Sequence, residues 1–143
     1  MSARRARPGR QDLGLTGLAV YSVEFRPDTL YLWFDRGIAY LEVGGLIGLR
    51  LPDGTSADYD ASSSGTSPTT PALLNGLVGA AVVDATAGEH PAILDVEFDS
   101  GLRLHYEPTS GPYEEWEAKD AAGTAYVCLP NNRLTVWQSG AGS

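Results

Sequence analysis

Carboxylates crowd one short stretch of the chain, "YEEWE" at residues 113–117. In an extended strand, alternate side chains point the same way about 7 Å apart, which would place Tyr113, Glu115 and Glu117 on one side. Two carboxylates on one strand face can serve as general acid and general base. Nothing in the sequence indicates that either is removed from water, so a hydrated acidic surface is the competing interpretation.

Other catalytic or ligand-binding patterns are incomplete. The serines of "SSSGTS" at 62–67 lie outside a G-x-S-x-G turn, and "DLGLTG" at 12–17 is not followed by the glycine-rich loop of a nucleotide site. The potential metal ligands His90, His105 and Cys128 lack the short spacing of a metal site. We therefore expect no catalytic residues, no cofactor and no metal ion.

Two similar phrases, "LYLWFDRGI" at 30–38 and "LDVEFDSGL" at 94–102, indicate the elements that carry these residues. Alternating apolar residues followed by Asp-x-Gly predict β-hairpins with three-residue loops. In the second hairpin, this register predicts an apolar face that pairs Phe98 with Leu102, Val96 with Leu104 and Leu94 with Tyr106. The opposite face is charged and pairs Glu97 with Arg103 and Asp95 with His105.

The first hairpin differs on its outer face. The same register pairs Phe34 with Ile38 and Leu32 with Tyr40 inward, and Trp33 with Ala39 and Tyr31 with Leu41 outward. Both faces are then apolar, and large aromatic side chains left in water would lose about 2 kcal/mol or more of burial each. Two interpretations stay open: the helix or the 113–117 strand covers this face, or a partner docks on Tyr31, Trp33 and Leu41.

Short strands and turn signals recur along the rest of the chain. They predict an all-β fold in which a duplicated β-meander, about 17–60 and 77–130, forms a sandwich, roll or partly open barrel. A proline followed by clustered leucines predicts one short helix near 71–78, capped by Thr70. Residues 56–70 are rich in Ser, Thr and Pro and predict a loop.

Composition predicts a single domain and an acidic body. We expect a disordered basic tail over residues 1–11, one β-rich domain over 12–138 and a flexible tail over 139–143. The chain has 10 basic and 18 acidic residues. Four of the arginines lie in the first ten residues, so six basic residues remain against 18 acidic ones, a net charge of −12. Such a body repels nucleic acid and anionic membranes and attracts basic proteins.

The single cysteine, Cys128, excludes an internal disulfide and suits a reducing compartment. No apolar run of the length that a signal peptide or membrane anchor requires follows the basic N-terminus. We therefore expect a cytoplasmic protein.

A distinctive pattern occupies the C-terminal part of the chain. Its members are Tyr113, Glu114, Trp116, Glu117, Val127, Cys128, Pro130, Leu134 and Trp137. With the Asp-x-Gly hairpins, it resembles a small actinobacterial all-β family of unknown function, in which two glycines stand where this chain has Asn131 and Asn132. Asparagine also tolerates positive φ, so we expect the turn to be kept. The same layout is similar to immunity proteins of bacterial toxin systems, which implies a compact acidic binder of a basic protein.

The leading interpretation is a non-enzymatic interaction domain, immunity-like or adaptor-like, with an acidic and aromatic surface for a protein partner of basic charge. The residues assigned to this surface are Tyr31, Trp33, Leu41, Tyr113, Glu115 and Glu117. The alternatives are a small-molecule binding domain or minor enzyme with a carboxylate-lined site, and a homo-oligomer such as a homodimer. Neither nucleic acid nor a membrane is an expected partner.

Overall fold

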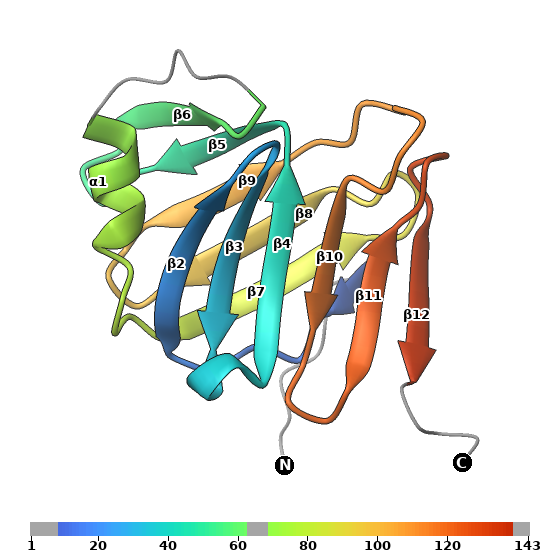
Figure 1. The fold of residues 1–143 in the computed structure, drawn as a ribbon, viewed down its shortest axis with the longest axis horizontal. Helices are drawn as coiled ribbons and strands as arrows, with labels where there is room; N and C mark the ends of the chain where they lie inside the picture. Colours follow the sequence, from blue (N-terminus) through green and yellow to red (C-terminus); the bar gives the residue numbers. More distant parts are fainter. Residues whose placement is uncertain (1–8, 63–68, 139–143) are drawn as a thin grey trace.

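The computed structural model describes residues 9–62 and 69–138. Figure 1 shows two antiparallel sheets, one stacked over the other, which confirms the predicted all-β fold as a sandwich. Sheet I has the order β12-β11-β10-β4-β3-β2, and sheet II has the order β1-β7-β8-β9-β5-β6. The strands of sheet I are β2 (Val20–Arg26), β3 (Thr29–Phe34), β4 (Ala39–Gly44), β10 (Trp116–Lys119), β11 (Thr124–Cys128) and β12 (Leu134–Gln138). Those of sheet II are β1 (Arg10–Asp12), β5 (Leu46–Arg50), β6 (Ser56–Asp60), β7 (Val82–Gly88), β8 (Leu94–Phe98) and β9 (Arg103–Tyr106).

The order of the strands repeats between the two halves of the chain. The first half places the meander β2-β3-β4 in sheet I and the hairpin β5-β6 in sheet II. The second half places the meander β7-β8-β9 in sheet II and the hairpin β10-β11 in sheet I. A bridge between Ala19 and Ala81 joins the chain at the starts of the two meanders. The two matching phrases predicted a duplicated meander, and the structure adds that each sheet is completed by a hairpin from the other half.

The core lies between the sheets and comes from the inward residues of both. Its largest fully buried side chains are Trp116, Phe34 and Phe98, surrounded by leucines from β3, β4 and β8. The second hairpin has the predicted register, since Leu94 pairs with Tyr106 and Val96 with Leu104. Alternation of apolar and polar residues thus placed this hairpin correctly.

The predicted register of the first hairpin is wrong by one residue. Asp35–Gly37 form a 3-10 turn, η1, and Ile38 also belongs to the connection, so Phe34 pairs with Ala39 rather than Ile38. A one-residue slip exchanges the two faces of a strand. Leu41, expected on the outer face, is fully buried in the core, and Tyr40, expected inside, lies outside.

The physical reason for this register is visible in β4 itself. The predicted register would have turned Glu42 inward along with Tyr40, whereas the observed one buries Leu41 and Val43 and leaves the carboxylate at the surface. Burying an unpaired carboxylate is far more costly than lengthening a turn by one residue. Positive φ angles at Asp35 and Arg36 make the longer turn possible.

Two other segments differ from the expectations. Arg10 and Gln11, assigned to the N-terminal tail, belong to β1, while residues 1–8 and 139–143 lie outside the described residues. Residues 56–60 form β6 rather than a loop, because every one of them pairs with β5. Of the rest of that segment, residues 63–68 also lie outside the described part.

The single described α-helix, α1, spans Thr69–Asn75 and ends one residue before Gly76, a poor helix former. Thr70, expected to cap a helix near 71–78, is instead buried within α1. The helix and the turn after it bury Leu74 and Leu77. Figure 1 shows α1 at one side of the sandwich, next to β6 and β2, and not over the outer face of sheet I.

Candidate functional site

Three aromatic side chains gather on the outer face of sheet I. Tyr31 and Trp33 of β3 and Tyr40 of β4 all point outward and are half-buried; we call them the aromatic cluster. The Tyr31 and Trp33 rings are stacked with centroids 5.1 Å apart, and the Tyr40 ring lies 5.5 Å from Trp33 and 6.1 Å from Tyr31. Ring pairs of this kind add about 0.5–1.5 kcal/mol each beyond burial. The cluster is therefore an ordered aromatic platform at the surface.

A salt bridge on β2 borders the aromatic cluster. Glu24 accepts hydrogen bonds from Arg26 Nε at 2.7 Å and Arg26 Nη2 at 3.1 Å, and from Trp33 Nε1 at 2.9 Å. The guanidinium carbon of Arg26 lies 4.1 Å from the centre of the Tyr31 ring. Hydrogen bonds from Arg26, and then from Trp33, hold the pKa of Glu24 below its ordinary value. A guanidinium group is thus held here by one carboxylate and one aromatic face.

Two more glutamates lie on the other side of the cluster. Glu42 of β4 pairs directly with Glu117 of β10. The Tyr40 hydroxyl donates a hydrogen bond to Glu117. Burial, and then the neighbouring Glu117, raise the pKa of Tyr40, and burial with Glu42 raises the pKa of Tyr31. Both phenols therefore stay protonated at neutral pH and can donate to these carboxylates.

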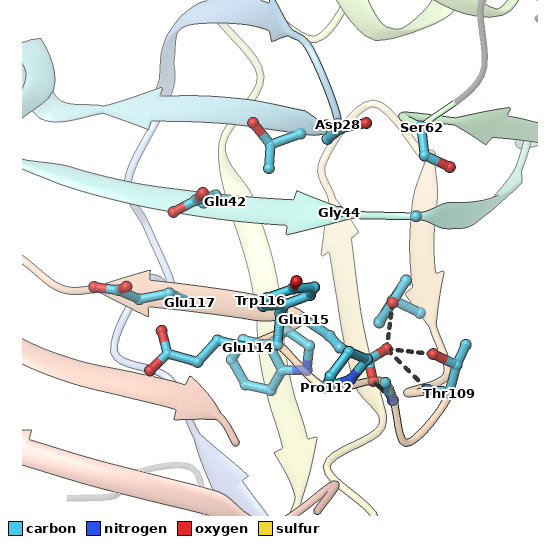
Figure 2. Close-up of a pocket in the computed structure, with 15 residues that line it drawn as sticks. Asp28, Glu42, Gly44, Ser62, Thr109, Pro112, Glu114, Glu115, Trp116 and Glu117 are labelled. Carbon is cyan, nitrogen blue, oxygen red and sulfur yellow. Dashed lines mark hydrogen bonds between the residues drawn. The ribbon is translucent and has the colours of Figure 1, made fainter. Parts of the chain in front are cut away.

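A cavity of about 500 Å³ opens beside this glutamate pair (Figure 2). The ends of β4 and β10 and the loop between β9 and β10 line it. Five carboxylates belong to the lining: Asp28, Glu42, Glu114, Glu115 and Glu117. No lysine, arginine or histidine is among the described residues that line it. The cavity is therefore strongly negative and suits a cationic group.

Glu115 ties down the loop that forms one wall of the cavity. Its Oε1 accepts hydrogen bonds from Tyr106 Oη at 2.6 Å, Thr109 N at 2.8 Å and Thr109 Oγ1 at 3.1 Å, and its Oε2 accepts one from Gly111 N at 3.0 Å (Figure 2). Partial burial alone would raise the pKa of Glu115, but the bonds from Tyr106 and from the loop backbone lower it below its ordinary value. Glu115 is thus an ionised carboxylate with both oxygens occupied, which is poorly suited to proton transfer.

Asn132 holds the same loop from the other side. It adopts a φ of +66° in the turn between β11 and β12, as expected for an asparagine that replaces glycine. Its side chain accepts a hydrogen bond from Ser110 N at 2.9 Å and donates one to Ser110 Oγ at 2.7 Å. The loop that lines the cavity is therefore fixed at two points.

The structure separates the six residues assigned to a binding surface. Tyr31 and Trp33 belong to the aromatic cluster, while Glu117 joins the cluster to the cavity through Tyr40. Tyr113 and Glu115 line the cavity, but from the loop before β10 and not from a strand. Leu41 lies in the core beneath.

The sequence reasoning missed Tyr40, Glu42 and Glu24. One signal could have found the first two: in "AYLEV", an inward Leu41 and Val43 require an outward Tyr40 and Glu42. Glu42 pairs with Glu117 because β4 lies next to β10. Local sequence patterns do not predict that these two strands are neighbours.

The outer face of sheet II is charged and internally paired, as predicted. Arg103 lies 3.6 Å from Glu97, and His105 lies 2.6 Å from Asp95 and 2.9 Å from Glu107. Partial burial would lower the pKa of His105, but the two carboxylates raise it above its ordinary value. These opposite charges therefore pair with one another within the protein.

Three further features concern the reactivity of the cysteine, metal binding and membrane-spanning helices. Cys128 is buried, and burial raises the pKa of its thiol to about 11, so it is unreactive at neutral pH. Over residues 9–62 and 69–138, no three side chains of the His, Cys, Asp or Glu type are placed to hold a metal ion. Within the same residues, no helix has the length and apolarity needed to cross a bilayer.

Comparison with known proteins gives a family but no activity. Neither the curated proteins nor the solved structures contain a match to this chain. A family model described as a family of unknown function, DUF6188, matches residues 11–138 and so covers both meanders and the whole candidate site. The chain therefore belongs to the DUF6188 family of unknown function.

Proposed function

We propose that the chain is a non-enzymatic interaction domain that binds a protein partner through the outer face of sheet I. The observation that carries this proposal is the aromatic cluster beside two glutamates that face each other, on a sheet face over which no described element packs. Clustered aromatic side chains with a polar border are typical of the energetic centres of protein interfaces. On the outer face of sheet II, by contrast, Arg103 already pairs with Glu97 and His105 with Asp95.

The proposal also covers the charge of the partner and the cellular location of the domain. The acidic chain, with a net charge of −8, favours a basic partner, which is the arrangement of an immunity-like or adaptor protein. A cytoplasmic location is part of the proposal, because the one cysteine of the chain excludes an internal disulfide.

Affinity capture from a native lysate tests the proposal with two matched variants. Trp33→Ala removes the centre of the aromatic cluster, while Tyr21→Ala removes an aromatic ring outside the cluster that is 59% exposed. We expect a specific protein that is retained by the wild type and by Tyr21→Ala and is lost with Trp33→Ala. Circular dichroism melting must show that both variants are folded. Equal retention by both folded variants would exclude this face as the binding surface.

A homodimer through the same face is the alternative that sedimentation decides. A two-fold interface uses one surface patch on both copies, and the outer face of sheet I is open for such self-association. A monomer at all concentrations removes this alternative. A dimer that Trp33→Ala dissociates would make the partner a second copy of this chain.

A small-molecule binding domain is the second candidate, because the cavity beside β4 and β10 is within the size range of ligand pockets. The cavity would suit a cationic ligand, since its described lining is acidic. Amide NMR with spermidine as probe distinguishes the candidates. Saturable shifts confined to the cavity at micromolar ligand would favour this candidate over a protein partner.

A further inference from the structure

The glutamate pair on sheet I opposes folding in the isolated protein. Glu42 and Glu117 stand directly opposite each other on neighbouring strands. Like charges that face each other across a sheet are destabilising, in contrast to the opposite charges of Glu97 and Arg103, which pair between β8 and β9 of sheet II. The hydroxyl groups of Tyr40 and Tyr31 lie against the pair, and the cationic side chains of Arg26 and Lys119 share the same face of the sheet. A cation between the two carboxylates would convert this repulsion into attraction.

Space for such a cation exists beside the pair. Gly44, two residues after Glu42 on the same face of β4, has no side chain, and together they line the cavity of about 500 Å³. Two of its lining residues, Tyr113 and Glu114, are exposed to solvent. The cavity borders both carboxylates, so an elongated side chain that enters it can reach them.

The protein already holds one guanidinium group on this face. Arg26 pairs with Glu24 through two nitrogens and packs on the Tyr31 ring. The glutamate pair offers the same two kinds of contact at the edge of the aromatic cluster, carboxylates and a tyrosine, and neither glutamate forms a salt bridge with a described residue. A planar guanidinium can bind two carboxylate oxygens at once and stack on an aromatic ring, which an ammonium group does less well.

We propose that the protein partner inserts an arginine side chain into the cavity and places its guanidinium group between Glu42 and Glu117, at the edge of the aromatic cluster. This inference rests on the proposed function, because it names the partner chemistry that the same face recognises. The partner is then a protein with a basic, arginine-bearing segment, in agreement with the net charge of −8 of this chain.

Titration calorimetry with two synthetic peptides tests the inference. The probes are blocked glycine-rich peptides with four arginines or four lysines, which have equal charge. Glu42→Gln removes one charge at the proposed site, and Glu97→Gln removes one charge on the opposite face of the sandwich. We expect the arginine peptide to bind more tightly than the lysine peptide. Glu42→Gln should weaken its affinity about tenfold, as loss of a charge-assisted contact predicts, and Glu97→Gln should change it less than twofold.

A melting experiment separates a binding effect from an effect on folding. Because Glu42 faces a like charge, Glu42→Gln should leave the melting temperature unchanged or raise it. Weaker binding together with a clearly lower melting temperature would overturn the inference, since it would trace the loss to unfolding.

The remaining outcomes also decide the question. Equal affinity for the two peptides, or equal weakening by Glu42→Gln and Glu97→Gln, would overturn the inference in favour of unspecific charge attraction. Failure of the peptides to bind, while affinity capture still finds a partner that Trp33→Ala loses, would overturn the arginine site and leave the proposed function intact. Binding of the arginine peptide without any captured partner would support the site and count against the proposed function.

Discussion

Replacement of Glu115 by glutamine tests whether this carboxylate holds the loop between β9 and β10 in place. The substitution keeps the size of the side chain and removes its charge. One oxygen can still accept from Tyr106 and Thr109, but the new amide group points a donor at the N–H of Gly111, whose bond at 3.0 Å is then lost. The loop should loosen while the sandwich stays folded.

The size of the effect follows from these contacts. Hydrogen bonds to a charged group contribute about 1.5–3 kcal/mol each, and the partial exposure of Glu115 places the net loss of unfolding free energy at about 2 kcal/mol. For a domain of this length, 1 kcal/mol shifts the melting temperature by about 2–4 °C, so we expect a decrease of about 4–8 °C at pH 7. Glu114→Gln is the matched control, because Glu114 is exposed, and its change should stay within about 0.5 kcal/mol.

The loss of unfolding free energy caused by Glu115→Gln depends on pH. The pKa of Glu115 is lower in the folded protein than its ordinary value of 4.5, so the unfolded chain binds this proton more readily. The stabilisation is therefore complete above pH 4.5 and is lost as the pH falls through the lower folded pKa. The difference in unfolding free energy between wild type and Glu115→Gln should shrink correspondingly in acid.

Urea denaturation followed by circular dichroism at pH 7 and at pH 3 measures both effects. Equal midpoints for Glu115→Gln and Glu114→Gln at pH 7 would refute the role of Glu115 in fixing the loop. A difference from wild type that grows in acid would refute the sign of the linkage.

Three further results are expected. The pKa of His105, measured by NMR titration, should lie above 6.5 and fall in Asp95→Asn; a value below 6.5 in the wild type would contradict the hydrogen bond of 2.6 Å between the two side chains. Gly101→Ala should lower the unfolding free energy in urea by more than about 1 kcal/mol, because φ is +94° and the added Cβ would lie 2.8 Å from Pro52 Cγ; an unchanged midpoint would contradict this. Trp116→Phe should lower it by about 1–3 kcal/mol, since the buried carbonyl group that accepts the indole N–H at 2.9 Å loses its partner, and a wild-type midpoint in urea would count against that contact.

The hairpins show how far local patterns reach. In the second hairpin, charged residues at every outward position of β8 and β9 left a single reasonable register, and the structure has it. In the first hairpin, both faces of β3 carry aromatic residues, so the contrast between an apolar and a charged face is missing. The register then depends on the length of the loop. The observed loop requires positive φ at Asp35 and Arg36, which is uncommon for residues other than glycine. The sequence therefore favoured a shorter, three-residue loop with positive φ at Gly37 alone.

The residues before β10 show a second case in which a local pattern does not predict the structure. Alternation across "YEEWE" predicts a strand, but strand β10 begins only at Trp116. The backbone of Glu115 still bonds to Gly44 and Cys128, but its side chain accepts hydrogen bonds from the backbone of Thr109 and Gly111 in the preceding loop. Such a local carboxylate-to-backbone contact requires that the loop already be folded back, and no periodic pattern encodes it.

The amino-acid sequence by itself determined the all-β class, the two related meanders and the contrast between one charged and one aromatic outer face, because period-two alternation and turn residues act over a few neighbours. Tertiary structure alone decided that β10 joins sheet I beside β4. That neighbourhood sets Glu117 against Glu42, while the register of the first hairpin places Leu41 in the core and Tyr40 in the aromatic cluster. Cross-strand contacts depend on which strands adjoin and in which register, and these are properties of the packed sandwich as a whole.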